Sequence, residues 1–450
     1  MDLIHQNTKK IYFRYLAAAF GSSLISTIYG LVDSIVVGQY SGPKGSAARA
    51  VMAPVWNIVF AFGLLFGIGG SVFFGHIRGK DKRERKESDG YFTVSLIGAL
   101  FASLLSRAVF FFFDKPRFTA LGADEEILAL CEEYLKPVKL AIPFYLFSQV
   151  LAAFLRNDHA PTLATIAVLV GGVVNVFGDL YFVFGLNRGL FGAGLATALG
   201  NTLSVLLRLI HFFRKKNTLG LVLPTHFFAK LGRIREGGFS AGFVDRARGI
   251  ITALLNNQIR KYLGSDALAV YGVIVYRSTC VQCCAYSVGQ AAQPILSANL
   301  GAGKPKRIKE VLRYSLFSCA FFGILWTLVR CLFPKQIVDL RRDATNEVLA
   351  ISGKIIILYS LSFLLLPFNI FSTYYFQSIR HPRTSLLLSL LRGAILCTLF
   401  ILLLPLVWGE RGIWLSRPLT ELVTSFAVVY FRVYWTRRLP KETTISSVSP

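Results

Sequence analysis

Long apolar stretches, separated by short polar segments, run along almost the whole chain. A helix that crosses the hydrocarbon layer of a membrane needs about 20 apolar residues, and about twelve stretches reach that length. Lipid cannot hydrogen-bond exposed backbone groups, and the stretches lack the short alternating pattern of a membrane β-barrel. The pattern therefore predicts an all-α polytopic membrane protein with spans at 11–38, 50–77, 91–113, 134–155, 162–186, 189–213, 237–260, 268–294, 311–333, 350–376, 384–406 and 412–435.

Composition supports this class and excludes others. Hydrophobic residues make up 54% of the chain and charged residues 16%, whereas a soluble protein carries about 25% charged residues on average. A soluble enzyme, a disordered chain and a secreted disulfide scaffold are excluded together. The net charge of +25 would suggest a nucleic-acid partner on a soluble protein. Here the basic residues cluster between apolar stretches, which indicates membrane topology, with lipid rather than nucleic acid as the partner.

The basic segments also predict an orientation. They follow even-numbered spans and lie on the same side as Lys9, Lys10, Arg437 and Arg438, whereas acidic residues 124–126 lie on the opposite side. Cytoplasmic loops carry an excess of Lys and Arg. Both termini are therefore expected in the cytoplasm, with the chain in the inner cell membrane; the basic segments are 78–86, 214–216, 304–309 and 380–383.

The chain repeats itself at a nearly constant offset. Gly42 corresponds to Gly264 (264 − 42 = 222), and Pro161 to Pro382 (382 − 161 = 221). Six spans separate each pair, so the two halves have the same orientation, as in transporters built from parallel repeats. The repeat predicts two pseudo-symmetric six-helix lobes around a central cavity, 1–217 and 218–450, with a linker at about 214–236.

Acidic residues within spans are energetically costly and are therefore candidates for function. Asp33 completes a polar helix face with Ser22, Ser26 and Tyr29, and Asn175 and Asp179 are four residues apart on one face of span five. Two carboxylates and an amide could hold a proton or a small hard cation such as Na⁺. The alternative is that each acid forms a structural ion pair with an arginine; Arg107, Arg208, Arg277 and Arg392 are available.

Several motifs, in order along the chain, resemble those of the multidrug and toxic compound extrusion (MATE) family. They are VDSIVVG (32–38), GPKGSAARA (42–50), RNDHAP (156–161), NVFGD (175–179), GAGLAT (192–197), GQAAQP (289–294), NLGAG (299–303), GIW (412–414) and PLTE (418–421). The resemblance implies an antiporter that exports drugs or other amphipathic compounds while H⁺ or Na⁺ enters, with no cofactor. It places the N-lobe cation site at Asp33, Asn175, Asp179 and Thr197, with Na⁺ the only metal expected.

The chain departs from this family pattern in span seven and near its C-terminus. The usual helix-opening proline is absent from GGFSAGF (237–243). Asp245 and Arg248 follow, either as a local ion pair at i, i+3 or as a second charged site for an anionic or zwitterionic substrate. Glu421 lies four residues after Arg417, so a structural ion pair is expected there. Polar groups expected in the substrate cavity are Tyr29, Gln149, Asn256 and Gln282.

Two other classes of function stay open. A lipid-linked saccharide flippase would need a cationic cavity, for which Arg246, Arg248 and Arg277 are candidates. An integral membrane enzyme is disfavoured, because no His, Cys or paired-acid site is evident at a membrane surface. No nucleotide-binding Gly-x-x-x-x-Gly-Lys-Ser/Thr motif is present. We therefore predict an ion-coupled transporter rather than an enzyme, acting as a monomer on a small organic substrate.

Overall fold

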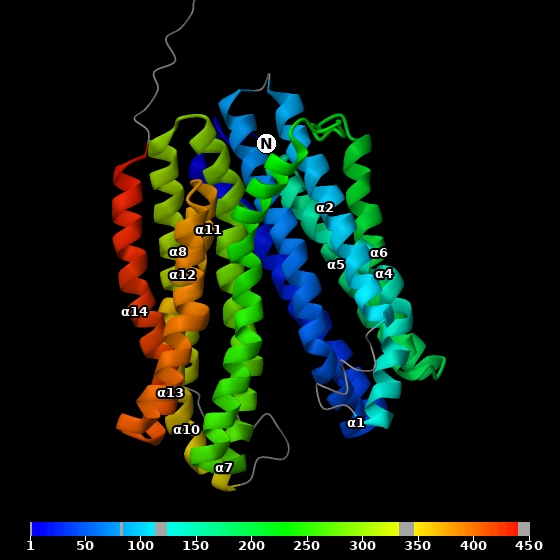
Figure 1. The fold of residues 1–450 in the computed structure, drawn as a ribbon, viewed down its shortest axis with the longest axis vertical. Helices are drawn as coiled ribbons and strands as arrows, with labels where there is room; N and C mark the ends of the chain where they lie inside the picture. The colour runs from blue at the N-terminus through cyan, green and yellow to red at the C-terminus, as the bar shows by residue number, and fades with distance from the viewer. Residues whose placement is uncertain (1, 82–83, 113–123, 333–345, 440–450) are drawn as a thin grey trace, which may run out of the picture. The chain divides into compact units, whose positions relative to one another are not determined.

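Helices make up all the regular structure in the described part of the chain, residues 2–81, 84–112, 124–332 and 346–439 of a computed structural model (Figure 1). This confirms the predicted all-α class. The α-helices are α1 (Thr8–Lys80), α2 (Arg85–Phe112), α4 (Glu125–Asn157), α5 (Pro161–Asp179), α6 (Gly189–Leu209), α7 (Phe227–Gly301), α8 (Pro305–Leu332), α10 (Asn346–Ser360), α11 (Ser362–Ser378), α12 (Pro382–Leu390), α13 (Leu396–Trp408) and α14 (Glu410–Arg437). Two π-helical turns, Leu180–Gly185 after α5 and Leu391–Ile395 after α12, and a 3-10 turn, Ile210–Phe213, complete the set.

The two longest helices, α1 and α7, each bend at a glycine. Gly42 has φ 62° and ψ −147°, and Gly264 has φ 78° and ψ −165°. A residue with a Cβ atom is strained in this conformation, whereas glycine adopts it readily. Each bend separates two predicted spans, and the two bends are 222 residues apart (264 − 42), which is the offset of the sequence repeat.

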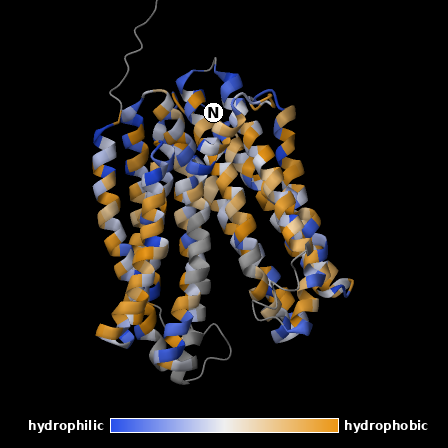
Figure 2. Ribbon diagram, in the orientation of Figure 1, coloured by the Kyte–Doolittle hydropathy of each residue, from blue (hydrophilic) through white to orange (hydrophobic). Residues whose placement is uncertain are grey.

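Eight helical segments in the described ranges are long and apolar enough to cross a membrane: Thr8–Lys80, Arg85–Phe111, Glu125–Asn157, Pro161–Gly185, Gly189–Phe213, Pro305–Leu332, Gly353–Ser378 and Pro382–Trp408. The first has 73 residues, and since one crossing needs about 20, it accommodates a crossing on each side of Gly42. Figure 2 shows hydrophobic residues along most of the helix lengths and hydrophilic residues gathered towards their ends.

The chain divides into two compact units. Unit 1 comprises Met1–Leu3 and Ala17–Gly242, and unit 2 comprises Ile4–Leu16 and Phe243–Pro450. Within unit 2, Tyr12 donates a hydrogen bond to Ser318 Oγ at 3.0 Å, so the start of α1 packs on α8. The lobe boundary at 217 and 218 stays a prediction drawn from the repeat.

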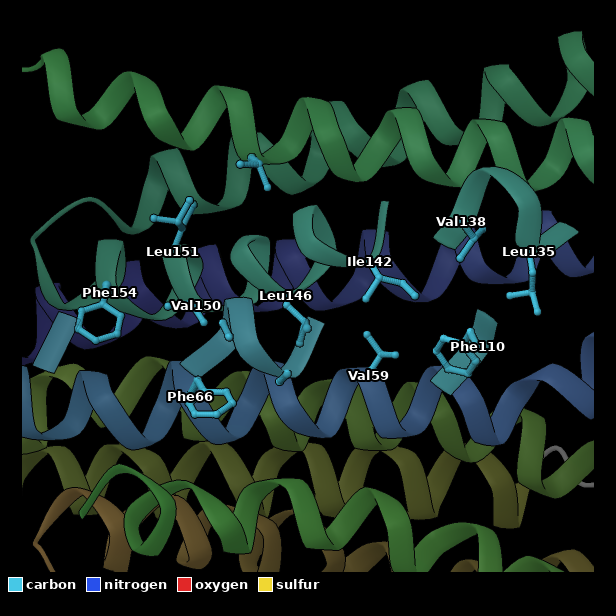
Figure 3. Close-up of a cluster of buried hydrophobic side chains, with 14 of the residues drawn as sticks. Val59, Phe66, Phe110, Leu135, Val138, Ile142, Leu146, Val150, Leu151 and Phe154 are labelled. Carbon is cyan, nitrogen blue, oxygen red and sulfur yellow. The ribbon is translucent and has the colours of Figure 1, made fainter. Parts of the chain in front are cut away.

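In unit 1, α4 packs against both α2 and α6, and α5 packs against α6. Figure 3 shows part of the apolar cluster that joins α1, α2 and α4, with Val59, Phe66, Phe110, Ile142 and Phe154 among its members. In a lipid environment the hydrophobic effect does not draw such helices together, because lipid tails are as apolar as the side chains. Close van der Waals packing therefore holds this cluster together.

Small residues allow α5 and α6 to approach closely. A Cβ atom on Gly171 would lie 2.5 Å from the carbonyl oxygen of Gly200, so glycine is required at this crossing. Close approach through small residues is common between membrane helices. One turn further along α5, the crossing places Asn175 beside Thr197 of α6.

In unit 2, α14 packs against α13 and α11, and α11 also packs against α8 and α12. This arrangement brings Asn369 of α11 to Glu421 of α14. The π-helical turn after α12 carries Arg392, which contacts the same carboxylate. Helix packing therefore assembles a buried polar group from three segments of unit 2.

Candidate functional site

Asp33 and Arg49 form an ion pair across the bend in α1. Arg49 Nη2 lies 2.5 Å from Asp33 Oδ2, and the two side chains are 19% and 3% exposed. A charge within a membrane span is costly unless it has a partner. The bend at Gly42 lies between the two residues in the chain, so one long helix supplies both members of the pair.

Asp179 and Asn175 lie on α5, where a π-helical turn begins directly after Asp179. Asn175 Nδ2 donates a hydrogen bond to Thr197 Oγ1 of α6 at 3.1 Å. Asp179 is fully buried, and its carboxylate is near enough to Asp33 and Arg49 to interact with both electrostatically. The four residues predicted for the cation site therefore lie in one region of unit 1.

Tyr134 of α4 connects the two parts of this cluster. Arg49 Nη1 donates a hydrogen bond to Tyr134 OH at 3.0 Å, and that hydroxyl lies 3.4 Å from Thr197 Oγ1. The Arg49 guanidinium also lies 5.3 Å from the centre of the Tyr134 ring, a cation–π distance. A continuous series of polar contacts thus runs from Asp33 through Arg49 and Tyr134 to Thr197 and Asn175.

Four oxygen atoms of this cluster accept no hydrogen bond within the described ranges: Asp33 Oδ1, Asn175 Oδ1 and both carboxylate oxygens of Asp179. Buried polar atoms without a partner are rare in proteins and often mark functional sites. With both acids ionised, the two carboxylates and the one guanidinium carry one net negative charge. This arrangement suits the uptake of one monovalent cation, either a proton or a small ion that prefers oxygen ligands.

Arg49 and Tyr134 were not identified from the sequence. The arginines that the sequence offered as partners for Asp33 and Asp179 were others. Those that the structure describes do not pair with either acid. Arg208 donates to Ser148 Oγ and to the carbonyl oxygen of Ala164, Arg392 pairs with Glu421 and Arg107 is exposed. Arg49 could have been suspected from the sequence because it is a lone arginine directly before the apolar stretch of span two. Nothing in the sequence distinguishes Tyr134 from the other tyrosines.

The polar face of α1 that leads to Asp33 lies partly on α5. Ser22 Oγ donates a hydrogen bond to Thr165 Oγ1 at 3.1 Å. Tyr29 packs against Gly172, where a Cβ atom would lie 3.2 Å from the tyrosine ring. The face predicted from helical spacing is therefore present in unit 1.

The residues predicted for the substrate cavity are partly exposed. Tyr29 and Gln149 belong to unit 1, and Asn256 and Gln282 belong to unit 2. Gln149 lies beside Gly63 of α1, where an added Cβ atom would be 2.9 Å from Gln149 Cβ. Asp245 and Arg248 belong to α7, but their side chains lie outside the described part of the structure.

Glu421 of unit 2 has a full set of partners. Arg392 Nε lies 2.9 Å from both of its carboxylate oxygens, Asn369 Nδ2 donates to Oε2 at 2.7 Å and Arg417 Nη2 lies 3.4 Å from Oε1. The expected pair with Arg417 is therefore present. Arg392 and Asn369 are additions that the sequence did not predict, because they belong to other segments.

A second buried carboxylate, Asp158, holds the segment that follows α6. Asp158 Oδ2 lies 2.7 Å from His211 Nε2 and accepts the backbone N–H of Thr218 at 3.0 Å, and Oδ1 accepts the Thr218 hydroxyl. Burial opposes ionisation of Asp158, but these hydrogen bonds outweigh it and lower the pKa of its carboxyl below the ordinary value of 3.8. Asp158 thereby ties the α4–α5 connection to the start of the predicted linker.

No group of three or more His, Cys, Asp or Glu side chains in the described ranges is arranged to hold a metal ion. The cluster around Asp33 and Asp179 combines two carboxylates with amide, hydroxyl and guanidinium groups instead.

Comparison with known proteins relates the chain to one transporter family. The sequence profile of the MatE family matches residues 18–180 and 250–403. The multidrug export protein MepA of Staphylococcus saprophyticus is 24% identical over 413 residues, which cover 90% of this chain and 89% of that protein. MepA of Staphylococcus aureus is 24% identical over 425 residues, covering 94% and 92%.

Two solved structures have the same fold. One is a multidrug resistance MATE family transporter of the MOP superfamily in an outward-facing conformation, with a TM-score of 0.90. The other is a MOP superfamily transporter from Pyrococcus furiosus, also with a TM-score of 0.90, for which a binding pocket of reverse polarity is said to suggest a different function. Each is 20% identical to this chain, and each match covers 98% of both chains.

Proposed function

The chain belongs to the MatE family, and from this membership we propose that it is a secondary active antiporter of the cell membrane. It exports drugs or other amphipathic organic compounds in exchange for H⁺ or Na⁺. The similarity to two proteins named multidrug export proteins supports this class of substrate. In this proposal the chain acts as a monomer, needs no cofactor and is a transporter rather than an enzyme. Both of its termini lie in the cytoplasm.

The observation that carries the proposal is the buried acid cluster of unit 1. Asp33 and Asp179 are almost completely buried, and three of their four carboxylate oxygens accept no hydrogen bond from the described residues. Uptake of one cation neutralises the net negative charge of the cluster. Because a net charge within a membrane span is energetically costly, neutralising it changes the relative stability of the conformations that these helices can adopt.

Coupling requires the ion and the substrate to prefer different conformations, because otherwise an ion gradient could not drive substrate movement. The acids lie on α1 and α5, and Thr197 lies on α6, so ion uptake acts on the packing of three helices of unit 1. We assign the ion to Asp33, Asn175, Asp179 and Thr197, and the substrate cavity to Tyr29, Gln149, Asn256 and Gln282. Asp245 and Arg248 are proposed as a second charged site.

Purified protein in liposomes tests the proposal. Export of a cationic dye is measured under a pH gradient alone and then under a Na⁺ gradient alone. The wild-type protein is expected to export the dye under one of them. Asp179→Asn is expected to reduce the gradient-driven export rate by about tenfold or more, equivalent to about 1.4 kcal/mol in the activation free energy of transport. Asp33→Asn is expected to lose a similar share.

The matched control is Glu133→Gln, which removes an exposed acid from α4 of the same unit and is expected to leave the rate unchanged. Normal export by both Asn variants would contradict the assignment of the coupling site. If the wild-type protein exports dye under neither gradient but moves a lipid-linked saccharide between leaflets, the flippase alternative holds.

A further inference from the structure

The ion pair between Arg49 and Asp33 places a positive charge of the protein itself beside the acids proposed to bind the coupling ion. The guanidinium is held in place by three kinds of contact. It lies 2.5 Å from Asp33 Oδ2, it donates to Tyr134 OH, and it lies over the Tyr134 ring. A group held at this many points stays within the cluster rather than extending towards solvent.

Among the described residues, the acids that interact electrostatically with this guanidinium are Asp33 and Asp179. The tyrosines Tyr134 and Tyr29 also interact with it. Arg49 balances one of the two acids, so the cluster has room for one further positive charge. A cluster without Arg49 would carry two net negative charges.

H⁺ and Na⁺ place different demands on such a cluster. A proton binds one carboxylate oxygen. A hard metal cation such as Na⁺ needs several oxygen ligands at once and is favoured by anionic ones. Arg49 holds one oxygen of Asp33, while Thr197 Oγ1 already accepts a hydrogen bond from Asn175. One oxygen of Asp33 is therefore engaged by Arg49. A fixed positive charge also lies next to the oxygens left open to an ion, which are Asp33 Oδ1, Asn175 Oδ1 and both carboxylate oxygens of Asp179.

We propose that Arg49 is a built-in counter-ion that excludes Na⁺ from this site and thereby determines which ion drives transport. Its guanidinium pairs with Asp33 and interacts electrostatically with Asp179, so a Na⁺ ion at these acids would be repelled by a positive charge that the protein itself supplies. This inference rests on the proposed function, which admits H⁺ or Na⁺. A site closed to Na⁺ leaves H⁺ as the coupling ion.

Dye export from liposomes tests the effect on transport. The pH gradient is first collapsed by a protonophore. Adding a Na⁺ gradient is then expected to leave the export rate of the wild-type protein at the level measured without any ion gradient. Arg49→Gln removes the positive charge, so that the cluster carries two net negative charges. This variant is expected to raise export under the Na⁺ gradient by about fivefold or more. The double variant Asp33→Asn with Arg49→Gln carries one acid again and is expected to lose this Na⁺ response. Arg188→Gln, which removes an exposed arginine from unit 1, is the matched control and is expected to behave as the wild type.

Thermal unfolding of the full chain in detergent gives a readout that does not depend on transport. Replacing choline chloride by NaCl is expected to leave the melting temperature of the wild-type protein unchanged and to raise that of Arg49→Gln by about 3 °C or more. Arg49→Lys keeps the positive charge and is expected to show no Na⁺ response.

A Na⁺-induced rise in the wild-type melting temperature, or Na⁺-driven export by the wild-type protein, would overturn the inference even if no Arg49 variant folds. A folded Arg49→Gln protein that ignores Na⁺ in both assays would overturn it as well. Failure of the wild-type protein to export dye under either gradient refutes the proposed function instead. The melting temperatures still decide whether Arg49 excludes Na⁺.

Discussion

At the scale of single residues, two buried acids differ in the partners that the fold provides. Glu421 receives hydrogen bonds from Arg392 and Asn369 and lies close to Arg417. Asp179 receives none from the described residues. A carboxylate with a full set of donors is stabilised as a permanent anion, whereas one without donors gains most from taking up a cation. A buried carboxylate is therefore expected to stabilise the fold in unit 2 and is proposed to bind the coupling ion in unit 1.

Replacing Glu421 tests its structural role. Glu421→Gln leaves Arg392 and Arg417 buried without a carboxylate and is expected to reduce the free energy of unfolding by about 3–5 kcal/mol. The melting temperature of the purified protein should fall by several degrees. Glu410→Gln, at an exposed position on the same helix, should change the free energy of unfolding by less than about 0.5 kcal/mol. Equal melting temperatures for the two variants would contradict the structural role.

The lowered pKa of Asp158 predicts a pH dependence of stability. Its folded-state pKa lies below the ordinary value of 3.8. Ionised Asp158 therefore stabilises the protein above pH 3.8, and this contribution is lost as the pH falls through the folded-state pKa. Asp158→Asn is expected to lower the free energy of unfolding by about 2 kcal/mol at neutral pH. The difference from the wild type should shrink below about pH 4.

Melting temperatures of the wild-type protein and Asp158→Asn between neutral pH and about pH 3 measure this dependence. Glu133→Gln, at an exposed position in α4, serves as the control and should match the wild type throughout. A difference for Asp158→Asn that is the same at every pH would show that the carboxylate charge makes no contribution.

At the scale of elements, the regular helix is interrupted next to charged residues in both units. A π-helical turn follows Asp179 in unit 1, and another carries Arg392 in unit 2. Such turns are rare in helices and concentrate at functional sites. The glycine bend in α1 belongs with them, because it allows Asp33 and Arg49 of one long helix to face each other.

Gly42→Ala tests the bend. The added Cβ atom would meet no atom within 4 Å, so the expected cost of about 1–3 kcal/mol arises from the positive φ alone. Gly232→Ala is the matched control, because it also has open space around it but lies in α7 without a positive φ. It is expected to stabilise the protein by up to about 1 kcal/mol. Thermal unfolding measures both; an equal effect would mean that the bend does not depend on glycine.

At the scale of the whole molecule, the distribution of charge predicts the orientation in the membrane. The net charge of +25 arises largely from basic segments that follow even-numbered spans. Positive loops are retained in the cytoplasm during insertion. The orientation is therefore a property of the whole chain rather than of a single site.

Reporter fusions measure the orientation. A fluorescent protein at the C-terminus is expected to fluoresce, and alkaline phosphatase at the same position is expected to be inactive, because it folds only outside the cytoplasm. Alkaline phosphatase inserted after Asp124, in an acidic segment, should be active. The reverse pattern would show that the positive segments do not face the cytoplasm.

The amino-acid sequence alone determined the helical class, the repeat and the candidate acids. These features are local: a span is recognised by its length and apolarity, because lipid admits few other structures. Asp33, Asn175 and Asp179 were found in the same way, since a polar residue in an apolar stretch is conspicuous. The helix boundaries were less accurate, because polar ends such as those of α4 continue the helix beyond the apolar stretch.

Only the tertiary structure decided which charges meet. The sequence predicts that Asp33 binds a proton or cation, or that it pairs with an arginine of another span. In the structure its partner is Arg49, beyond the glycine bend of the same helix. Tyr134 joins the cluster from α4, and Arg392 reaches Glu421 from a π-helical turn. An ion pair depends on the distance between two side chains in space, and the local pattern of hydrophobic and polar residues does not specify that distance. The spans could therefore be predicted from the sequence, whereas the counter-ion proposed to select the coupling ion became visible only once the helices had packed.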